Sequence, residues 1–307
     1  MTAPLRSNLN DMHGVWTALI TPFRTDQQID WDAFEKLLTL QDEAGVTGVV
    51  IAGTTGESPT LSVQEKLALI RKARAFLSPR TRLMAGTGDN NTQQSVELSR
   101  LAQDSGADSL LVVTPPYNKP STAGLIQHYR AIAQAVQIPL CLYHVPGRTA
   151  QMLQVEQLAE ICEGAGIKAI KEASGDLGFF ARSQMRTKGT FLSGDDPTYL
   201  ASLAVGGKGI ISVAANIFPR AFVALTNAFF HGDIERSQAI FQTLLPAIDA
   251  LFCEVNPCPL KSALASLHLC KNVLRLPLVP ISEANATHVE AVIRATQDTL
   301  KRILADA

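Results

Sequence analysis

Short apolar runs rich in β-branched residues alternate along the chain with longer segments in which apolar side chains recur every three or four positions. The longer segments have the periodicity of amphipathic helices, and the short runs have the length of buried strands. Strands that alternate with helices indicate parallel βαβ units, because parallel strands need a crossover between them. The eight apolar runs are residues 15–20, 48–53, 82–88, 109–115, 139–145, 167–173, 190–196 and 209–214.

Two of the helical segments carry signals for where a helix starts or stops. Ser62 and Glu65 have the spacing of a capping box, and Gly45 provides a C-terminal stop. We therefore predict helices over 30–45 and 62–77. Their predicted inward faces consist of Phe34, Leu37, Leu38 and Gln41 in the first helix and of Val63, Leu67, Ile70 and Leu77 in the second.

Eight strand–helix units are what a closed (β/α)8 TIM barrel needs, whereas a doubly wound sheet usually has fewer strands. We predict an α/β fold with this barrel over residues 1–232. From about Asp233 the alternation stops, and residues 233–307 are predicted to form a C-terminal helical region packed on the barrel. The apolar stripe of its last helix consists of Val289, Val292, Ile293, Thr296, Leu300 and Ile303.

Composition narrows the class of partner. Hydrophobic residues make up 46%, and the formal net charge of -1 offers no electrostatic reason to bind nucleic acid or an anionic membrane, so we expect a small-molecule partner. The segment "MTAPLRSNLNDMHG" lacks the apolar core of a signal peptide, and no run has the length of a membrane span. We expect a cytoplasmic protein. Its five cysteines form no C-x-x-C pair, which indicates reduced thiols and argues against a structural zinc site.

In a TIM barrel the catalytic groups lie where strands end and loops begin, at the C-terminal face. Polar clusters stand at these places in the sequence, which predicts a chemical site at the barrel mouth. The clusters are "GTTGES" (53–58), "TPPYNKP" (114–120), "YHVPGRT" (143–149), "KEASGD" (171–176) and "SGDD" (193–196).

Two lysines in the sixth run raise a question about burial. Lys168 and Lys171 are an odd number of positions apart, so their side chains point to opposite faces of a strand. Lys168 is the candidate for the outward face. Lys171 either forms a salt bridge with Glu172 or Asp176, or it is a buried amine whose lowered pKa lets it attack a ketone and form a Schiff base.

The other clusters allow both chemical and structural interpretations. "GTTGES" lacks the G-K-[ST] ending of a P-loop, but Thr54 and Thr55 offer hydroxyls and N–H groups for a carboxylate, unless the segment is an ordinary turn. Tyr143 and Tyr117 are candidates for a proton relay or for packing at a polar boundary. Arg148 is a candidate for a two-pronged grip on a substrate carboxylate, or for a structural ion pair.

Two further motifs have simpler interpretations. "GGKGIIS" (206–212) is a candidate phosphate grip, although close strand packing explains its glycines equally well. His144 has no second histidine nearby, so we interpret it as a structural residue and not as a metal ligand.

With these motifs in this order, the sequence resembles the dihydrodipicolinate synthase and N-acetylneuraminate lyase family of pyruvate-dependent class I aldolases. The resemblance runs from "GVWTALITPF" to "NPCPLK" and "LRLPLVPI", and "GTTGES" with the Y-x-V-P-x-R-T segment is similar to the synthase branch. It implies that Lys171 is the Schiff-base lysine, Tyr143 a proton-relay tyrosine, and Thr54 and Tyr117 further catalytic residues, Tyr117 in a neighbouring subunit's site. It also implies that the substrate-binding residues are Thr55, Arg148, Gly194 and Ile211.

The same resemblance implies a reaction and an assembly. Pyruvate would condense with aspartate semialdehyde to a cyclic product of lysine and diaminopimelate biosynthesis, without a metal or organic cofactor, in a homotetramer built as a dimer of dimers. The alternatives are another pyruvate aldolase or a keto-deoxy-sugar-acid dehydratase, a noncatalytic barrel subunit, or a phosphosugar isomerase that uses "GGKG".

This chain departs from the family's pattern at several positions. The asparagine that usually follows the relay tyrosine is His144, and one tyrosine of the usual pair is Pro116. In members that lysine inhibits, polar effector-site residues stand at the positions of Val63, Lys66, Gln94 and Pro116, while Ser58 and Asn90 are retained here. The resemblance therefore implies that lysine does not inhibit this protein.

Overall fold

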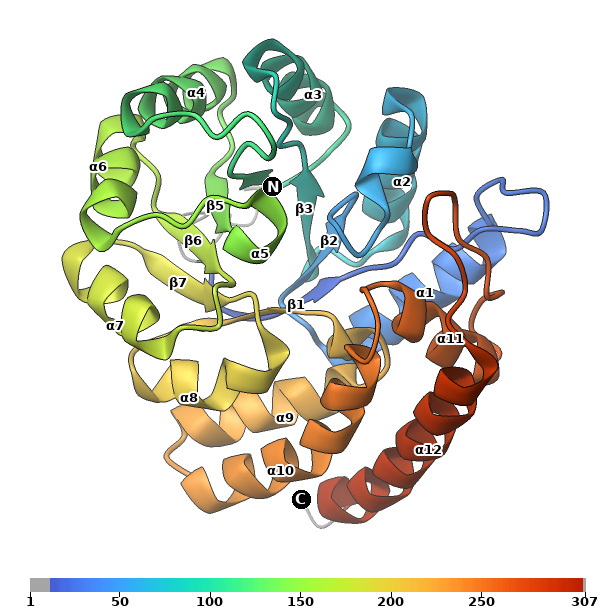
Figure 1. Ribbon diagram of the computed structural model, residues 1–307. Coiled ribbons are helices and arrows are strands. Elements are labelled where there is room, and N and C mark those ends of the chain that lie inside the picture. The colour runs from blue at the N-terminus through green and yellow to red at the C-terminus, as the bar shows by residue number, and fades with distance from the viewer. Residues whose placement is uncertain (1–11, 306–307) are drawn as a thin grey trace, which may run out of the picture.

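The structure, a computed structural model, describes residues 12–305 and contains a closed barrel of eight parallel strands surrounded by helices (Figure 1). Each strand pairs with the next along the chain, and β8 closes the barrel on β1. The predicted (β/α)8 barrel is confirmed. The strands are β1 Gly14–Ala18, β2 Gly48–Ile51, β3 Arg82–Gly86, β4 Ser109–Val113, β5 Leu140–His144, β6 Ala169–Glu172, β7 Thr190–Ser193 and β8 Gly209–Ser212.

Side chains fill both faces of the barrel wall. The outward side chains pack under the helices, and the inward ones form a separate cluster inside the barrel that includes Trp16, Met84 and Leu192. Burial on both faces explains why the strands read as continuous apolar runs instead of alternating ones. Space inside is tight: a Cβ at Gly48 would lie 2.5 Å from the Trp16 ring, so only glycine fits there.

The helices that cover the barrel begin and end largely where the sequence predicts. Asp30 caps α1, Gly45 ends it with φ 73°, and both halves of the predicted capping box of α2 are formed. Val63 is an exception, since 44% of it is exposed and it lies off the inward face. The barrel helices are α1 Trp31–Ala44, α2 Val63–Phe76, α3 Thr92–Asp104, α4 Thr122–Ala135, α6 Val155–Ala165, α7 Leu177–Arg186, α8 Tyr199–Ala204 and α9 Pro219–Phe230, and the short helices are α5 Pro146–Thr149, η1 Ser58–Thr60, η2 Asp196–Thr198 and η3 Ala214–Asn216.

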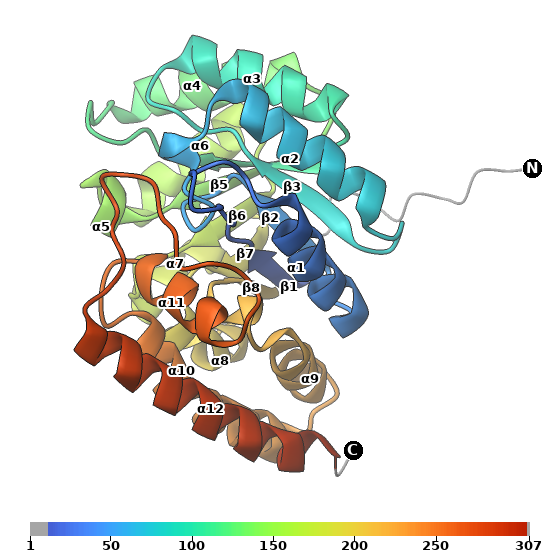
Figure 2. The ribbon, with the colours of Figure 1, turned by 90° about the vertical axis from the view of Figure 1, so that its right-hand side faces the viewer.

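Three further helices form the C-terminal region: α10 Ile234–Leu251, α11 Cys258–Ser266 and α12 Glu283–Ala305. Figures 1 and 2 show α12 alongside α10 on the outside of the molecule. The predicted stripe of α12 faces inward, with four of its side chains buried and Val292 and Ile303 partly buried against the same core. This region shares one hydrophobic core with the barrel, and the division at 232/233 stays a prediction. Within residues 12–305, no helix is both long and apolar enough to cross a membrane.

Candidate active site

Strand β6 places Lys171 inside the barrel. Lys171 is only 6% exposed and lies two positions from Ala169, which belongs to the interior cluster, whereas Lys168 is exposed just before the strand. The Nζ of Lys171 lies 4.1 Å from the centroid of the Tyr143 ring, because the register of β5 and β6 sets these two residues side by side. The predicted opposite orientation of the two lysines is confirmed.

Neither carboxylate considered as a salt-bridge partner for Lys171 plays that role. Glu172 points to the other side of the wall, where its Oε1 lies 3.2 Å from His144 Nδ1. The side chain of Asp176 instead caps α7 by accepting a hydrogen bond from the Phe179 N–H. Among residues 12–305 no carboxylate forms an ion pair with Lys171, which agrees with the interpretation as an amine nucleophile, and that role stays a prediction.

His144 is fully buried in the barrel wall, and its hydrogen bonds determine which of its ring nitrogens carries a proton. The backbone N–H of Leu153 donates to Nε2 over 3.2 Å, so Nε2 must present its lone pair. Nδ1 therefore carries the proton and donates it to Glu172. The pair joins β5 to β6 on the outer face, which fits the interpretation of His144 as a structural residue.

A cavity of about 370 Å³ opens at the C-terminal ends of the strands. It brings together most of the site residues that the sequence predicts. Ile211 is instead fully buried in the interior cluster, and Tyr117, on the loop after β4, is 90% exposed with φ 72°. The predicted site residues that line the cavity are Thr54, Thr55, Tyr143, Arg148, Lys171 and Gly194.

The C-terminal region supplies wall residues that the sequence reasoning missed: Phe252, Val255 and Asn256. Asn256 makes the most direct contacts. Its Nδ2 donates to Thr55 Oγ1 over 3.0 Å, and its backbone oxygen accepts a hydrogen bond from Arg148 Nη2 at 3.4 Å. The motif "NPCPLK", which contains Asn256, stands out in the sequence, but nothing in the sequence indicates that it lies beside the cavity.

A second cavity, of about 410 Å³, adjoins the first and shares Thr54, Tyr143 and Arg148 with it. Its wall contains Lys66 and a single carboxylate, Asp89. Burial lowers the pKa of Lys66, and the nearby charge of Asp89 opposes this shift. Of the predicted effector positions, Ser58, Asn90, Lys66 and Pro116 line this cavity, whereas Val63 and Gln94 are exposed outside it.

The segment 53–58, which carries both threonines, folds into a compact turn, called here the 53–58 turn. The N–H groups of Gly56 and Ser58 donate to the Gly53 oxygen over 3.1 and 3.2 Å, and the Glu57 N–H donates to the Thr54 oxygen over 3.1 Å. The Thr21 hydroxyl donates to the Gly56 oxygen over 2.7 Å. The turn is thus fixed from within and from the loop after β1.

Glu57, which lies in this turn, has a fully buried carboxylate. Its Oε1 forms an ion pair with Lys261 of α11, whose side chain is also 0% exposed, and its Oε2 accepts the backbone N–H of Arg275 over 3.0 Å. Burial lowers the pKa of Lys261, and the charge of Glu57 opposes that shift. The buried pair joins the 53–58 turn to the C-terminal region.

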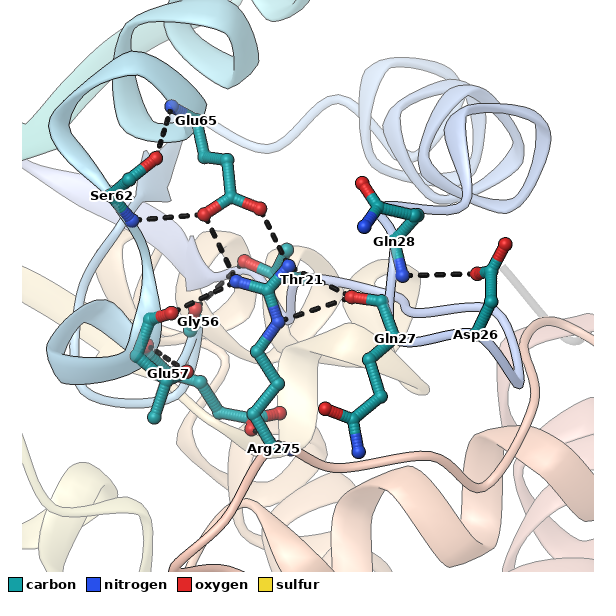
Figure 3. A network of polar contacts seen from close by, with 10 residues as sticks. Thr21, Asp26, Gln27, Gln28, Gly56, Glu57, Ser62, Glu65 and Arg275 are labelled. Carbon is teal, nitrogen blue, oxygen red and sulfur yellow. Dashed lines mark hydrogen bonds and ion pairs between the residues drawn. The ribbon is translucent and has the colours of Figure 1, made fainter.

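Arg275 extends these contacts outward, as Figure 3 shows. Its guanidinium donates to both oxygens of Glu65, to the backbone oxygen of Gln27 and to that of Thr60. The hydrogen bonds from Arg275 lower the pKa of Glu65 to about 2. The start of α2 and the segment between α11 and α12 are thereby held together.

Asp196, beside the cavity-lining Asp195, ties the ends of β7 and β8 together. It is fully buried, accepts the Val213 N–H over 2.9 Å and pairs with the Ser212 hydroxyl. Burial raises its pKa to about 6, and the neighbouring charge of Asp195 adds to that shift. Within residues 12–305, no group of three or more His, Cys, Asp or Glu side chains is placed to hold a metal ion.

Comparison with known proteins agrees with this geometry. The model of the Dihydrodipicolinate synthetase family matches residues 11–296. The 4-hydroxy-tetrahydrodipicolinate synthase of Leptospira biflexa is 45% identical over 276 residues, which cover 89% of this chain and 94% of the relative, and that of Methanocaldococcus jannaschii is 42% identical over 284 residues, which cover 92% and 97%.

A solved structure of a relative has the same fold. The structure of the 4-hydroxy-tetrahydrodipicolinate synthase from Methylacidiphilum fumariolicum SolV is similar with a TM-score of 0.93 and 37% identity, covering 96% of this chain and 99% of that one. The family match spans nearly the whole chain, and the fold and the motifs at the barrel mouth agree with it. The chain therefore belongs to the dihydrodipicolinate synthetase family.

Proposed function

We propose that this chain condenses pyruvate with L-aspartate 4-semialdehyde to give 4-hydroxy-tetrahydrodipicolinate, a step of lysine and diaminopimelate biosynthesis, through a Schiff base on Lys171. The observation that carries the proposal is a buried amine without a carboxylate partner among residues 12–305, facing a cavity at the barrel mouth. The names of the relatives, all 4-hydroxy-tetrahydrodipicolinate synthases, support the same reaction.

The first half of the reaction is imine chemistry on pyruvate. The neutral amine of Lys171 attacks the ketone carbon, and loss of water leaves a protonated imine. The positive nitrogen draws electrons from the neighbouring methyl group, which loses a proton and gives an enamine. Tyr143, whose ring lies 4.1 Å from Nζ, and Thr54 are the proposed proton carriers. Thr55 and the backbone near Gly194 line the cavity where the pyruvate carboxylate would bind.

The second half joins the two substrates. The enamine carbon attacks the aldehyde carbon, whose oxygen takes up a proton and becomes a hydroxyl group. Arg148, which lines the cavity, would hold the carboxylate of the semialdehyde. The amino group of the semialdehyde then replaces the lysine amine at the imine carbon, which closes the ring and returns Lys171 to its free form.

We further propose a homotetramer, a dimer of dimers, located in the cytoplasm. Tyr117 supports the contact between two subunits, because a large aromatic side chain that is 90% exposed and held at φ 72° is poorly placed to serve its own chain. Light scattering of the purified protein tests the assembly, and a monomer with full activity would contradict the proposed role of Tyr117.

The decisive test of the Schiff base is reduction with borohydride in the presence of pyruvate, followed by mass measurement. The wild-type protein and the matched control Lys168→Ala should each gain one pyruvate-derived adduct, and Lys171→Ala should gain none. A wild-type level of trapping in Lys171→Ala would overturn the assignment. Turnover with aspartate semialdehyde compared with sugar aldehydes separates the synthase from a dehydratase or another aldolase of the same scaffold.

A further inference from the structure

The backbone of the 53–58 turn is held in an unfavourable conformation. Ala52, just before the turn, has φ 56°, and Glu57, within it, has φ 55°. Residues with a Cβ rarely adopt this left-handed region, and they keep it only where surrounding contacts hold them there. The orientation of Thr54 and Thr55 therefore depends on what holds Glu57.

The backbone of Glu57 is bonded within its own segment, but its side chain is held by the C-terminal region. Its two carboxylate oxygens contact Lys261 Nζ and the Arg275 N–H. Lys261 is fixed in turn, because its Nζ donates to the Val273 oxygen over 2.8 Å and lies 4.2 Å from the centroid of the Phe23 ring. Each partner of the pair thus has further contacts that define its position.

A gain in folding stability does not by itself account for the ion pair between Glu57 and Lys261. Two charges with fully buried side chains lose their hydration on folding, and apolar replacements of such pairs are often as stable or more stable. Neither Glu57 nor Lys261 lines the 370 Å³ cavity, so neither is placed to touch a substrate there. What the pair does provide is a fixed link between the 53–58 turn and α11.

Asn256 makes a second link from the same region to the same turn. Its Nδ2 donates to Thr55 Oγ1, so the proton of the Thr55 hydroxyl is free to donate elsewhere, and Thr55 lines the cavity. A donor in the cavity wall suits a substrate carboxylate. Asn256 thereby sets the direction of the hydroxyl, while Glu57 and Lys261 set the backbone that carries it.

We infer that Glu57, Lys261 and Asn256 are positioning residues for pyruvate, through which the C-terminal region sets the affinity of the 53–58 turn for the pyruvate carboxylate. The inference rests on the proposed function, in which this turn binds pyruvate. It requires that loss of the links weakens pyruvate binding while the chemistry on Lys171 and the binding of the second substrate are retained.

The test separates charge burial from positioning. Glu57→Gln and Lys261→Met each leave one buried charge unpaired and should lower the melting temperature, whereas the double variant carries no buried charge there and should recover much of it. The KM for pyruvate should nevertheless stay raised about tenfold or more in the double variant, because the fixed contact is absent. The kcat at saturating pyruvate and the KM for aspartate semialdehyde should change less than about threefold.

Two further variants complete the design. Asn256→Ala removes no charge, so it should raise the KM for pyruvate with a melting temperature close to that of the wild type. The matched control is Asp298→Asn with Lys301→Met, which removes an exposed ion pair of the same type on α12 without touching the turn. This control should change neither quantity.

The outcomes distinguish the inference from the function on which it rests. Without a borohydride-trapped pyruvate adduct in the wild type, the proposed function fails. With that adduct present, the inference is overturned if the folded double variant and Asn256→Ala both show a wild-type KM for pyruvate. It is also overturned if the KM follows the melting temperature across all the variants, since that pattern belongs to a purely structural pair.

Discussion

The ion pair between Glu65 and Arg275 predicts a specific dependence of stability on pH. The hydrogen bonds that Arg275 donates to both oxygens of Glu65 lower the pKa of this carboxyl from its ordinary value of 4.5 to about 2. The charged form is favoured by folding, so this stabilisation is fully present above pH 4.5 and is lost as the pH falls toward 2. At about 1.4 kcal/mol per pKa unit, and reduced because part of the pair is exposed, it contributes about 2–3 kcal/mol at neutral pH.

The variant Glu65→Gln isolates the charge, because a glutamine can still accept the Ser62 N–H that Glu65 Oε2 accepts at 2.9 Å. Urea unfolding of both proteins should give a difference of about 2–3 kcal/mol at pH 7, which falls to roughly half near pH 3. The control Glu290→Gln, in an exposed pair with Arg294 on α12, should change the free energy of unfolding by only about 0.5 kcal/mol. A difference between wild type and Glu65→Gln that is the same at every pH would refute the reasoning.

Three further predictions concern the site. Arg148→Ala should leave the trapping of pyruvate intact but lower kcat/KM for aspartate semialdehyde by an amount equivalent to about 2–4 kcal/mol of transition-state stabilisation. An equal loss in trapping and in condensation would indicate a structural arginine. Tyr117→Phe mixed with Lys171→Ala should regain activity when subunits exchange; exchange without recovery would place Tyr117 in its own chain's site. Free lysine should not inhibit the enzyme, because the charge of Lys66 offsets that of Asp89 in the wall of the cavity of about 410 Å³, and Pro116 offers no hydroxyl. Saturable inhibition of initial rates by sub-millimolar lysine would contradict this.

Local patterns in the sequence predict the barrel and the place of its chemistry well. The strand runs are distinct because both faces of the wall are buried, and the odd spacing of Lys168 and Lys171 is enough to orient them. The exposure of Val63 was mispredicted, since the first turn of a helix can carry an apolar residue outside the packed face. Periodicity gives the face of a helix more reliably than its ends.

Contacts between distant segments were beyond such patterns. Asn256 and Thr55 are far apart in the sequence, and nothing in the spacing of either motif indicates that they meet. The same holds for Glu57 and Lys261. Glutamate and lysine side chains are usually exposed, so nothing in these separate motifs indicates that the two residues form a buried ion pair. Ile211, which the resemblance implies is a substrate-binding residue, lies in the interior cluster and is not among the residues that line the cavity of about 370 Å³, so its role stays a prediction.

The buried pair of Glu57 and Lys261 restricts how this chain can evolve. A mutation at either residue alone leaves one charge buried without its partner, which is far costlier than replacing both. The segment after β2 and the start of α11 must therefore change together, even though most of the barrel is encoded between them. A hybrid gene that joins the barrel of one relative to the C-terminal helices of another would avoid an unpaired buried charge only if both halves carried matching members of the pair.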